Sequence, residues 1–162
     1  MKRIAASFIN VDLDVKATVD LSPLAKAWTD QVMPLHVGKN GRRHWVRFEL
    51  TGPVCDPGDA ILRFCRLIQR LPRAGRVAWR NASFKEFDIG IQAGLESRTS
   101  EWLLRPTVVA AVRNVGAHIR VTVYSPLPLL EAENQRLWRL TTTSGLYESF
   151  VNGTMAHAID RD

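Results

Sequence analysis

The sequence predicts an α+β domain in which a mostly antiparallel sheet of four or more strands has helices packed on one face. Several segments alternate apolar and polar residues, as strands with one buried face do. Segments with apolar residues at helical spacing lie between them. The chain has 162 residues, of which 46% are hydrophobic and 23% charged, so its size and composition fit one globular domain over 1–162.

The first part of the chain predicts a strand, a short helix and a second strand. Residues 11–15 alternate between apolar and acidic side chains, which predicts the first strand. Residues 21–28 predict a short helix, with Pro23 near its first turn. A turn is expected at 38–41, and residues 45–50 alternate again and predict the second strand.

The second part predicts two more helix and strand pairs and a C-terminal helical segment. Apolar residues at helical spacing predict a linking helix over about 59–71. Residues 87–91 alternate as a third strand, and a helix is expected to begin at Pro106. Residues 119–123 predict the fourth strand, and about 127–162 is expected to be a helical segment.

An internal similarity predicts that the domain arose by duplication. Residues 6–17 align with 82–93 at an offset that places Asp12 over Asp88, and five aligned positions are identical. Similarity over this distance favours one duplicated supersecondary unit over a solenoid of many short repeats. We therefore expect two pseudo-twofold-related βαβ-like halves, at about 4–50 and 80–125.

The net charge of +6 and the pI near 9.9 suit an anionic partner. Arg63, Arg66 and Arg70 fall on one face of the linking helix, where they could bind nucleic acid or an acidic surface. Basic residues are interleaved with acidic ones, however, and no nucleic-acid recognition motif occurs. Nucleic acid is therefore the less favoured partner, and a solvated polar helix face is the simpler interpretation of the three arginines.

The sequence contains none of the common cofactor motifs. Cys55 and Cys65 form no CxxC pair, and the four histidines lack the spacing of metal ligands. Glycine-rich phosphate loops are also missing. We expect no cofactor and no metal. The N-terminal residues do not predict a signal peptide and no segment predicts a membrane span, so a cytoplasmic protein without a membrane partner is expected.

The outward side chains of the predicted strands should form a polar sheet face. Asp12 and Asp88 would meet across the pseudo-twofold, where two carboxylates could share a proton or hold a cation. With Arg47 and Arg120 they are the candidate catalytic residues. Acids beside arginines on an exposed sheet usually form cross-strand pairs instead, so whether the chain is an enzyme stays open and a non-catalytic protein is favoured.

Tryptophan and arginine residues near loops or on outward faces are candidates for binding another protein, because these residue types dominate interface hot spots. The candidate partner-binding residues are Trp45, Arg63, Arg66, Arg70, Trp79, Arg80 and Trp102.

Several segments resemble a family of small bacterial proteins catalogued as domain of unknown function 4279. The likeness rests on residues 45–48, on Phe87-Asp88-Ile89-Gly90-Ile91 and on the block 103–124, and it covers about 4–125. It implies a small cytosolic protein without an assigned reaction. Some such proteins resemble immunity proteins that neutralise toxins delivered between bacteria. The arginine-rich composition makes a nuclease an unexpected target.

The leading hypothesis is therefore a non-catalytic bacterial protein-binding factor, either an immunity-type protein that neutralises a toxin or a regulatory factor. A small-ligand binder or enzyme that uses the polar sheet face is the alternative, and a nucleic-acid-binding protein is a further alternative. The identity of the partner and the oligomeric state stay open.

Overall fold

A computed structural model describes residues 5–95 and 99–126. The chain divides into two units, Met1–Ser125 and Pro126–Asp162, and the elements below all belong to the first. The helical segment predicted over 127–162 lies outside the described residues. In chain order the elements are β1 (Ser7–Ala17), α1 (Ser22–Ala27), β2 (Val32–Asn40), β3 (Arg43–Leu50), α2 (Pro57–Gln69), α3 (Arg73–Asn81), β4 (Phe84–Gln92), α4 (Pro106–Val115) and β5 (His118–Tyr124).

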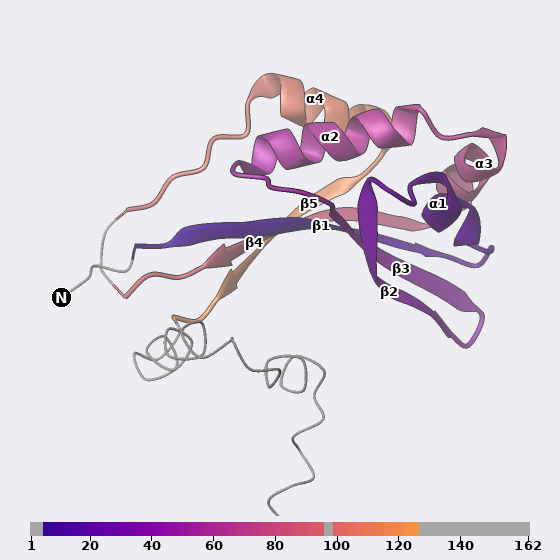
Figure 1. Ribbon diagram of the computed structural model, residues 1–162, viewed down its shortest axis with the longest axis horizontal. Coiled ribbons are helices and arrows are strands. Elements are labelled where there is room, and N and C mark those ends of the chain that lie inside the picture. The colour runs from indigo at the N-terminus through magenta and orange to yellow at the C-terminus, as the bar shows by residue number, and fades with distance from the viewer. Residues whose placement is uncertain (1–4, 96–98, 127–162) are drawn as a thin grey trace, which may run out of the picture. The chain divides into compact units, whose positions relative to one another are not determined.

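The strands form one sheet in the order β2-β3-β1-β4-β5. Every neighbouring pair is antiparallel except β4 and β5, which are parallel. The described helices all lie on one side of this sheet, and none of them lies on its other face (Figure 1). The predicted fold class, a mostly antiparallel sheet with helices on one face, is confirmed.

The hydrophobic core lies between the sheet and the helices. Val11, Leu13 and Val15 of β1 are buried, as their alternation predicts. Aromatic pairs join the two layers: Trp28 packs edge-on against Phe48 with ring centroids 5.3 Å apart, and Phe64 of α2 lies 5.9 Å from Phe87 of β4. One consequence of this packing is that polar residues at the alternate strand positions point to the uncovered face.

Two helix boundaries follow from local chemistry. The side chain of Asp56 accepts a hydrogen bond of 3.0 Å from the Asp59 N–H and so caps the start of α2. Gly116 ends α4 in the left-handed conformation, with φ of 67°. Its N–H donates to the Arg113 carbonyl, and the Ala117 N–H donates to the Val112 carbonyl.

Two elements were not expected from the sequence, β2 and α3. The predicted turn at 38–41 is wrong in extent, because residues 38–40 belong to β2 and Asn40 pairs with Arg43. The turn is Gly41-Arg42, in which only Gly41 has positive φ. As an edge strand, β2 exposes residues on both faces, so it has no alternating apolar pattern.

The central strands β1 and β4 place the two aligned acids opposite each other, since Asp12 pairs with Asp88 in the antiparallel register. The closing strands differ between the proposed halves: β3 is antiparallel to β1, whereas β5 is parallel to β4. The internal duplication therefore stays a prediction.

Candidate binding site on the open sheet face

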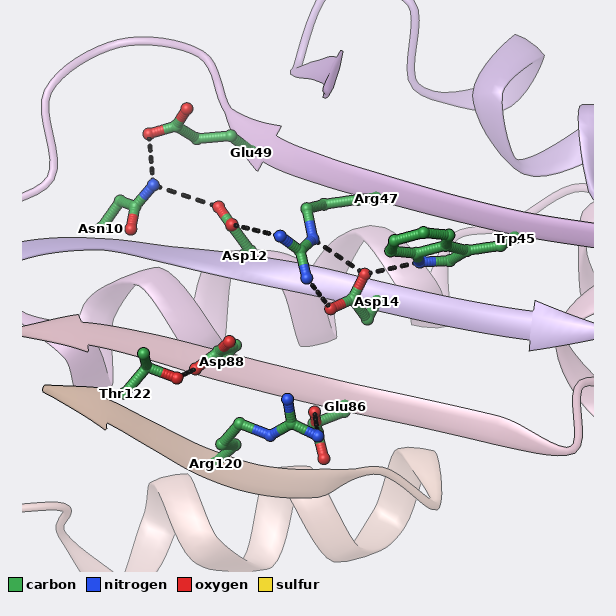
Figure 2. A network of polar contacts seen from close by, with 10 residues as sticks. All are labelled: Asn10, Asp12, Asp14, Trp45, Arg47, Glu49, Glu86, Asp88, Arg120 and Thr122. Carbon is green, nitrogen blue, oxygen red and sulfur yellow. Dashed lines mark hydrogen bonds and ion pairs between the residues drawn. The ribbon is translucent and has the colours of Figure 1, made fainter. Parts of the chain in front are cut away.

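The uncovered side of the sheet carries a connected set of polar side chains, which we call the open sheet face (Figure 2). The set draws on β1, β3, β4 and β5, because each of these strands directs alternate residues away from the helices. The open sheet face comprises Asn10, Asp12, Asp14, Trp45, Arg47, Glu49, Glu86, Asp88, Arg120 and Thr122.

Asp14 is the most firmly held carboxylate of this face. It is only 3% exposed. Arg47 donates to both of its oxygens, through Nε at 2.9 Å and Nη2 at 2.6 Å, and Trp45 Nε1 adds a third hydrogen bond of 2.8 Å. A two-point arginine–carboxylate pair fixes geometry as well as charge. These contacts raise the pKa of Arg47 and keep it positively charged.

A second ion pair joins β4 to β5. Arg120 Nη2 lies 2.9 Å from Oε1 of Glu86, which is buried. Among the described residues, no donor meets this oxygen with hydrogen-bond geometry. The contact is therefore an ion pair without a directed hydrogen bond, and half of the Arg120 side chain remains exposed.

Asp12 and Asp88 face each other across the two central strands and have weaker partners. Asp12 accepts a hydrogen bond of 3.1 Å from Asn10, and its nearest cation is Nη1 of Arg47 at 3.9 Å. Asp88 accepts one of 2.6 Å from Thr122. Asn10 also donates to Glu49 at 3.0 Å. The acids of this face outnumber its arginines, so its centre keeps negative charge.

Burial raises the pKa of Asp12 to about 6. The charge of Arg47 opposes this shift, while Glu49, Asp14 and Asp88 add to it. Asp12 therefore keeps its proton to a higher pH than an ordinary aspartate does.

Aromatic and cationic side chains border the acidic centre. The Lys16 ammonium lies 5.0 Å from the ring centroid of Trp45 and 4.9 Å from that of Phe84. His36 of β2 packs against the Trp45 ring with centroids 4.3 Å apart. Trp45 is thus fixed by its hydrogen bond to Asp14 and by contacts on its ring.

The structure brings the four candidate catalytic residues Asp12, Asp88, Arg47 and Arg120 to one face, as expected. Asp12 and Asp88 pair across β1 and β4, as expected. Arg47 and Arg120 bind Asp14 and Glu86 most closely, and neither acid was a candidate. Asp14 lies on the outward side of its strand and could have been selected on that ground. Glu86 lies before the predicted strand 87–91, so strand periodicity gave no reason to select it.

The arginines of α2 do not form one free basic row. Arg63 donates to the Pro53 carbonyl at 3.2 Å and to the Thr51 carbonyl at 3.1 Å, and it thereby anchors the loop after β3. Arg66 and Arg70 are exposed on the same helix. Nucleic-acid binding through these residues stays a prediction.

Trp79 is a candidate partner-binding residue expected near a loop or on an outward face, and the structure does not expose it. Trp79 is buried, and its Nε1 donates a hydrogen bond of 3.0 Å to the Val115 carbonyl. The error follows from the missed helix α3, which turns Trp79 toward the end of α4. Trp102 is half-buried and packs against the core, while Arg80 is exposed. Of the candidate tryptophans, Trp45 is the one that belongs to the open sheet face.

The described residues include no group of three or more His, Cys, Asp or Glu side chains arranged to hold a metal ion. None of the described helices combines the length and apolar character that crossing a membrane would need. No family model, no curated protein and no solved structure matches the chain. The family resemblance noted in the sequence therefore stays a prediction.

Proposed function

We propose that this chain is a non-catalytic binding protein whose open sheet face receives a partner protein that presents lysine or arginine side chains. The observation that carries the proposal is the pairing of Asp12 with Asp88, next to Glu49, on a face that none of the described helices covers. The arginines of this face are already engaged by other acids.

Rigidity of the face supports a binding role. Asp14, Trp45 and Arg47 hold one another by hydrogen bonds, and Glu86 holds Arg120. Side chains that are already ordered lose less conformational entropy when a partner binds. The face is therefore suited to recognition without rearrangement.

Charge supports the choice of partner. The chain as a whole carries +6, so the acidic centre of the open sheet face stands out as a site of opposite charge for a cationic partner. Like charges that face each other across strands are destabilising, and a cation from a partner would relieve this repulsion. Charge complementarity of this kind mainly sets specificity and association rate.

A toxin or a regulatory protein is the specific form of partner that we propose. The family resemblance points to bacterial immunity-type proteins, and such a protein would occlude its target with a preformed face. A target with a basic active site would match the acidic centre of the open sheet face.

The proposal can be tested by capture with charge-matched variants. The full chain is immobilised and exposed to lysate of the source organism, and to purified products of neighbouring genes. The Asp12→Asn/Asp88→Asn variant should lose the protein that the wild type retains. The control variant Asp30→Asn/Asp59→Asn removes the same charge from exposed positions outside this face and should retain it. Equal retention by both variants, with folding checked by circular dichroism, would contradict the proposal.

A second candidate function is recognition or conversion of a small cationic ligand at the same face. The raised pKa of Asp12 opposite Asp88 favours it, because a group that exchanges protons near pH 6 can act in acid–base chemistry. Thermal-shift measurements with polyamines and basic amino acids test this function. A stabilisation that disappears in the Asp12→Asn/Asp88→Asn variant supports it, and no shift with any of these compounds argues against it.

A further inference from the structure

A groove of about 500 Å³ lies away from the open sheet face, where α3, β4 and the end of α4 meet. Four cationic side chains line it: Arg76 and Arg80 from α3, Lys85 from β4 and Arg113 from α4. No carboxylate is among its lining residues. We call it the cationic groove.

The positive charges of the cationic groove lack carboxylate partners in the described part of the chain. The ion pairs among the described residues lie on the open sheet face instead, where they join Arg47 and Arg120 to acids. Arg76 uses one N–H, which donates to the Leu71 carbonyl at 2.8 Å, and its other N–H groups remain for a ligand. Four like charges around one groove repel one another, and a bound anion would relieve that repulsion.

Burial lowers the pKa of Lys85, whose ammonium lies 5.4 Å from the centroid of the Trp79 ring. A cation that is partly removed from water, with no counterion from the described residues, gains from an anion delivered by a ligand. Lys85 therefore points to the same kind of ligand as the arginines do.

The C-terminal ends of α2 and α4 border the cationic groove and oppose an anion, since a helix C-terminus carries partial negative charge. Several carbonyls at the end of α4 are already bonded, however. The Val115 carbonyl accepts from Trp79 Nε1, and the Arg113 carbonyl accepts from the Gly116 N–H. The hydrogen bonds from these donors reduce the partial negative charge at the end of α4.

We propose that the cationic groove binds a small phosphoryl oligoanion, a di- or triphosphate that is either free or part of a nucleotide. Planar guanidinium groups match phosphate oxygens in pairs. The volume is within the range of small-molecule sites. Cations spread over three elements suit a ligand with several charged groups better than a single phosphate ion, and Asn114 adds an amide donor.

Isothermal titration calorimetry of the full chain with tripolyphosphate tests the proposal at low and at physiological salt. Binding should weaken with salt, and the Arg80→Ala/Arg113→Ala variant should weaken it at least about tenfold, as loss of two charge-assisted contacts implies. Both arginines are exposed, so the fold should tolerate the change. The control Arg42→Ala/Arg43→Ala removes the same charge from exposed positions at the β2–β3 turn and should leave the affinity within about twofold.

A site-specific readout separates groove binding from general attraction to a basic protein. In ¹⁵N NMR spectra the indole N–H of Trp79 should shift on addition of tripolyphosphate, while that of Trp45 on the open sheet face should not. Equal weakening in both double variants overturns the proposal, and so does the absence of binding at low salt. Tighter binding of a single-stranded oligonucleotide or of orthophosphate than of tripolyphosphate also overturns it. Tighter binding of the oligonucleotide would indicate a nucleic-acid-binding surface.

Discussion

Asp14 is the residue on which the order of the open sheet face depends. It is buried and accepts three hydrogen bonds, from Trp45 and from two nitrogens of Arg47. Removal of the Asp14 side chain would leave the Arg47 guanidinium and the Trp45 indole N–H without their acceptor. Unpaired groups of this kind cost more than the bonds themselves contribute.

We therefore expect Asp14→Ala to lower the free energy of unfolding by about 2–3 kcal/mol. The control Asp30→Ala changes an exposed acid and should stay within about 0.5 kcal/mol of the wild type. Urea denaturation followed by circular dichroism measures both values. Similar stabilities for the two variants would show that the Asp14 contacts do not hold in solution.

Asp12 predicts a pH dependence of stability. Its pKa is raised to about 6 in the folded chain, from an ordinary value of 3.8. The folded state therefore binds its proton more tightly than the unfolded state does, and stability falls as pH rises through the range 4 to 6. Arg47 lowers this pKa, whereas Glu49, Asp14 and Asp88 raise it.

The variant Asp12→Asn removes this titration and keeps an oxygen for the Asn10 side chain. Its stability relative to the wild type should increase between pH 4.5 and pH 7.5, by on the order of 1–2 kcal/mol. Urea denaturation of both proteins at several pH values gives the difference directly. A difference that is constant across this range would mean that Asp12 titrates normally.

At the scale of elements, α3 is a helix that the pattern of apolar residues in the sequence did not predict. It has three arginines and a glycine among nine residues, and its buried residues are Gly75, Ala78 and Trp79. Gly75, Ala78 and Trp79 follow helical spacing, but Trp79 is the one large apolar side chain among them, so the apolar pattern is weak in the sequence. Tertiary interactions hold it in place: α3 packs against α1, and Trp79 donates a hydrogen bond to the Val115 carbonyl at the end of α4.

Trp79→Phe should consequently lower the free energy of unfolding by about 1–2 kcal/mol, because the Val115 carbonyl loses its donor. Trp102→Phe provides the comparison, since Trp102 is half-buried and donates no hydrogen bond within the described residues; its loss should be smaller. Thermal unfolding of the two variants makes the comparison. Equal losses of stability in the Trp79→Phe and Trp102→Phe variants would argue against the hydrogen bond between α3 and α4.

The end of α4 gives a second prediction at this scale. Gly116 has φ of 67°, a conformation that is unfavourable for residues with a Cβ atom. Gly116→Ala should lower the free energy of unfolding by about 1 kcal/mol, and Gly116→Asn should lower it less, because asparagine tolerates this conformation. Denaturant titrations of both variants test the order. Equal unfolding free energies for Gly116→Ala and Gly116→Asn would contradict this order.

At the scale of the whole molecule, the sequence predicts the layers of sheet and helices better than it predicts which acid each arginine binds. Alternation in β1, β3 and β4 is strong enough to predict a sheet with one buried face, and Asp56, Pro106 and Gly116 mark helix boundaries. The same alternation places Asp12 and Arg47 outward. Which acid each arginine binds depends on strand order and register, and these are set by contacts between distant segments.

The most direct test of the account is to map the surface that meets the captured partner. The ¹⁵N-labelled chain is titrated with the protein retained by the wild type, and backbone amide shifts are followed by NMR. The account predicts that the largest shifts fall in β1, β3, β4 and β5, around Asp12, Arg47 and Asp88. Shifts confined to α2, α3 and α4, with the strands unchanged, would contradict it.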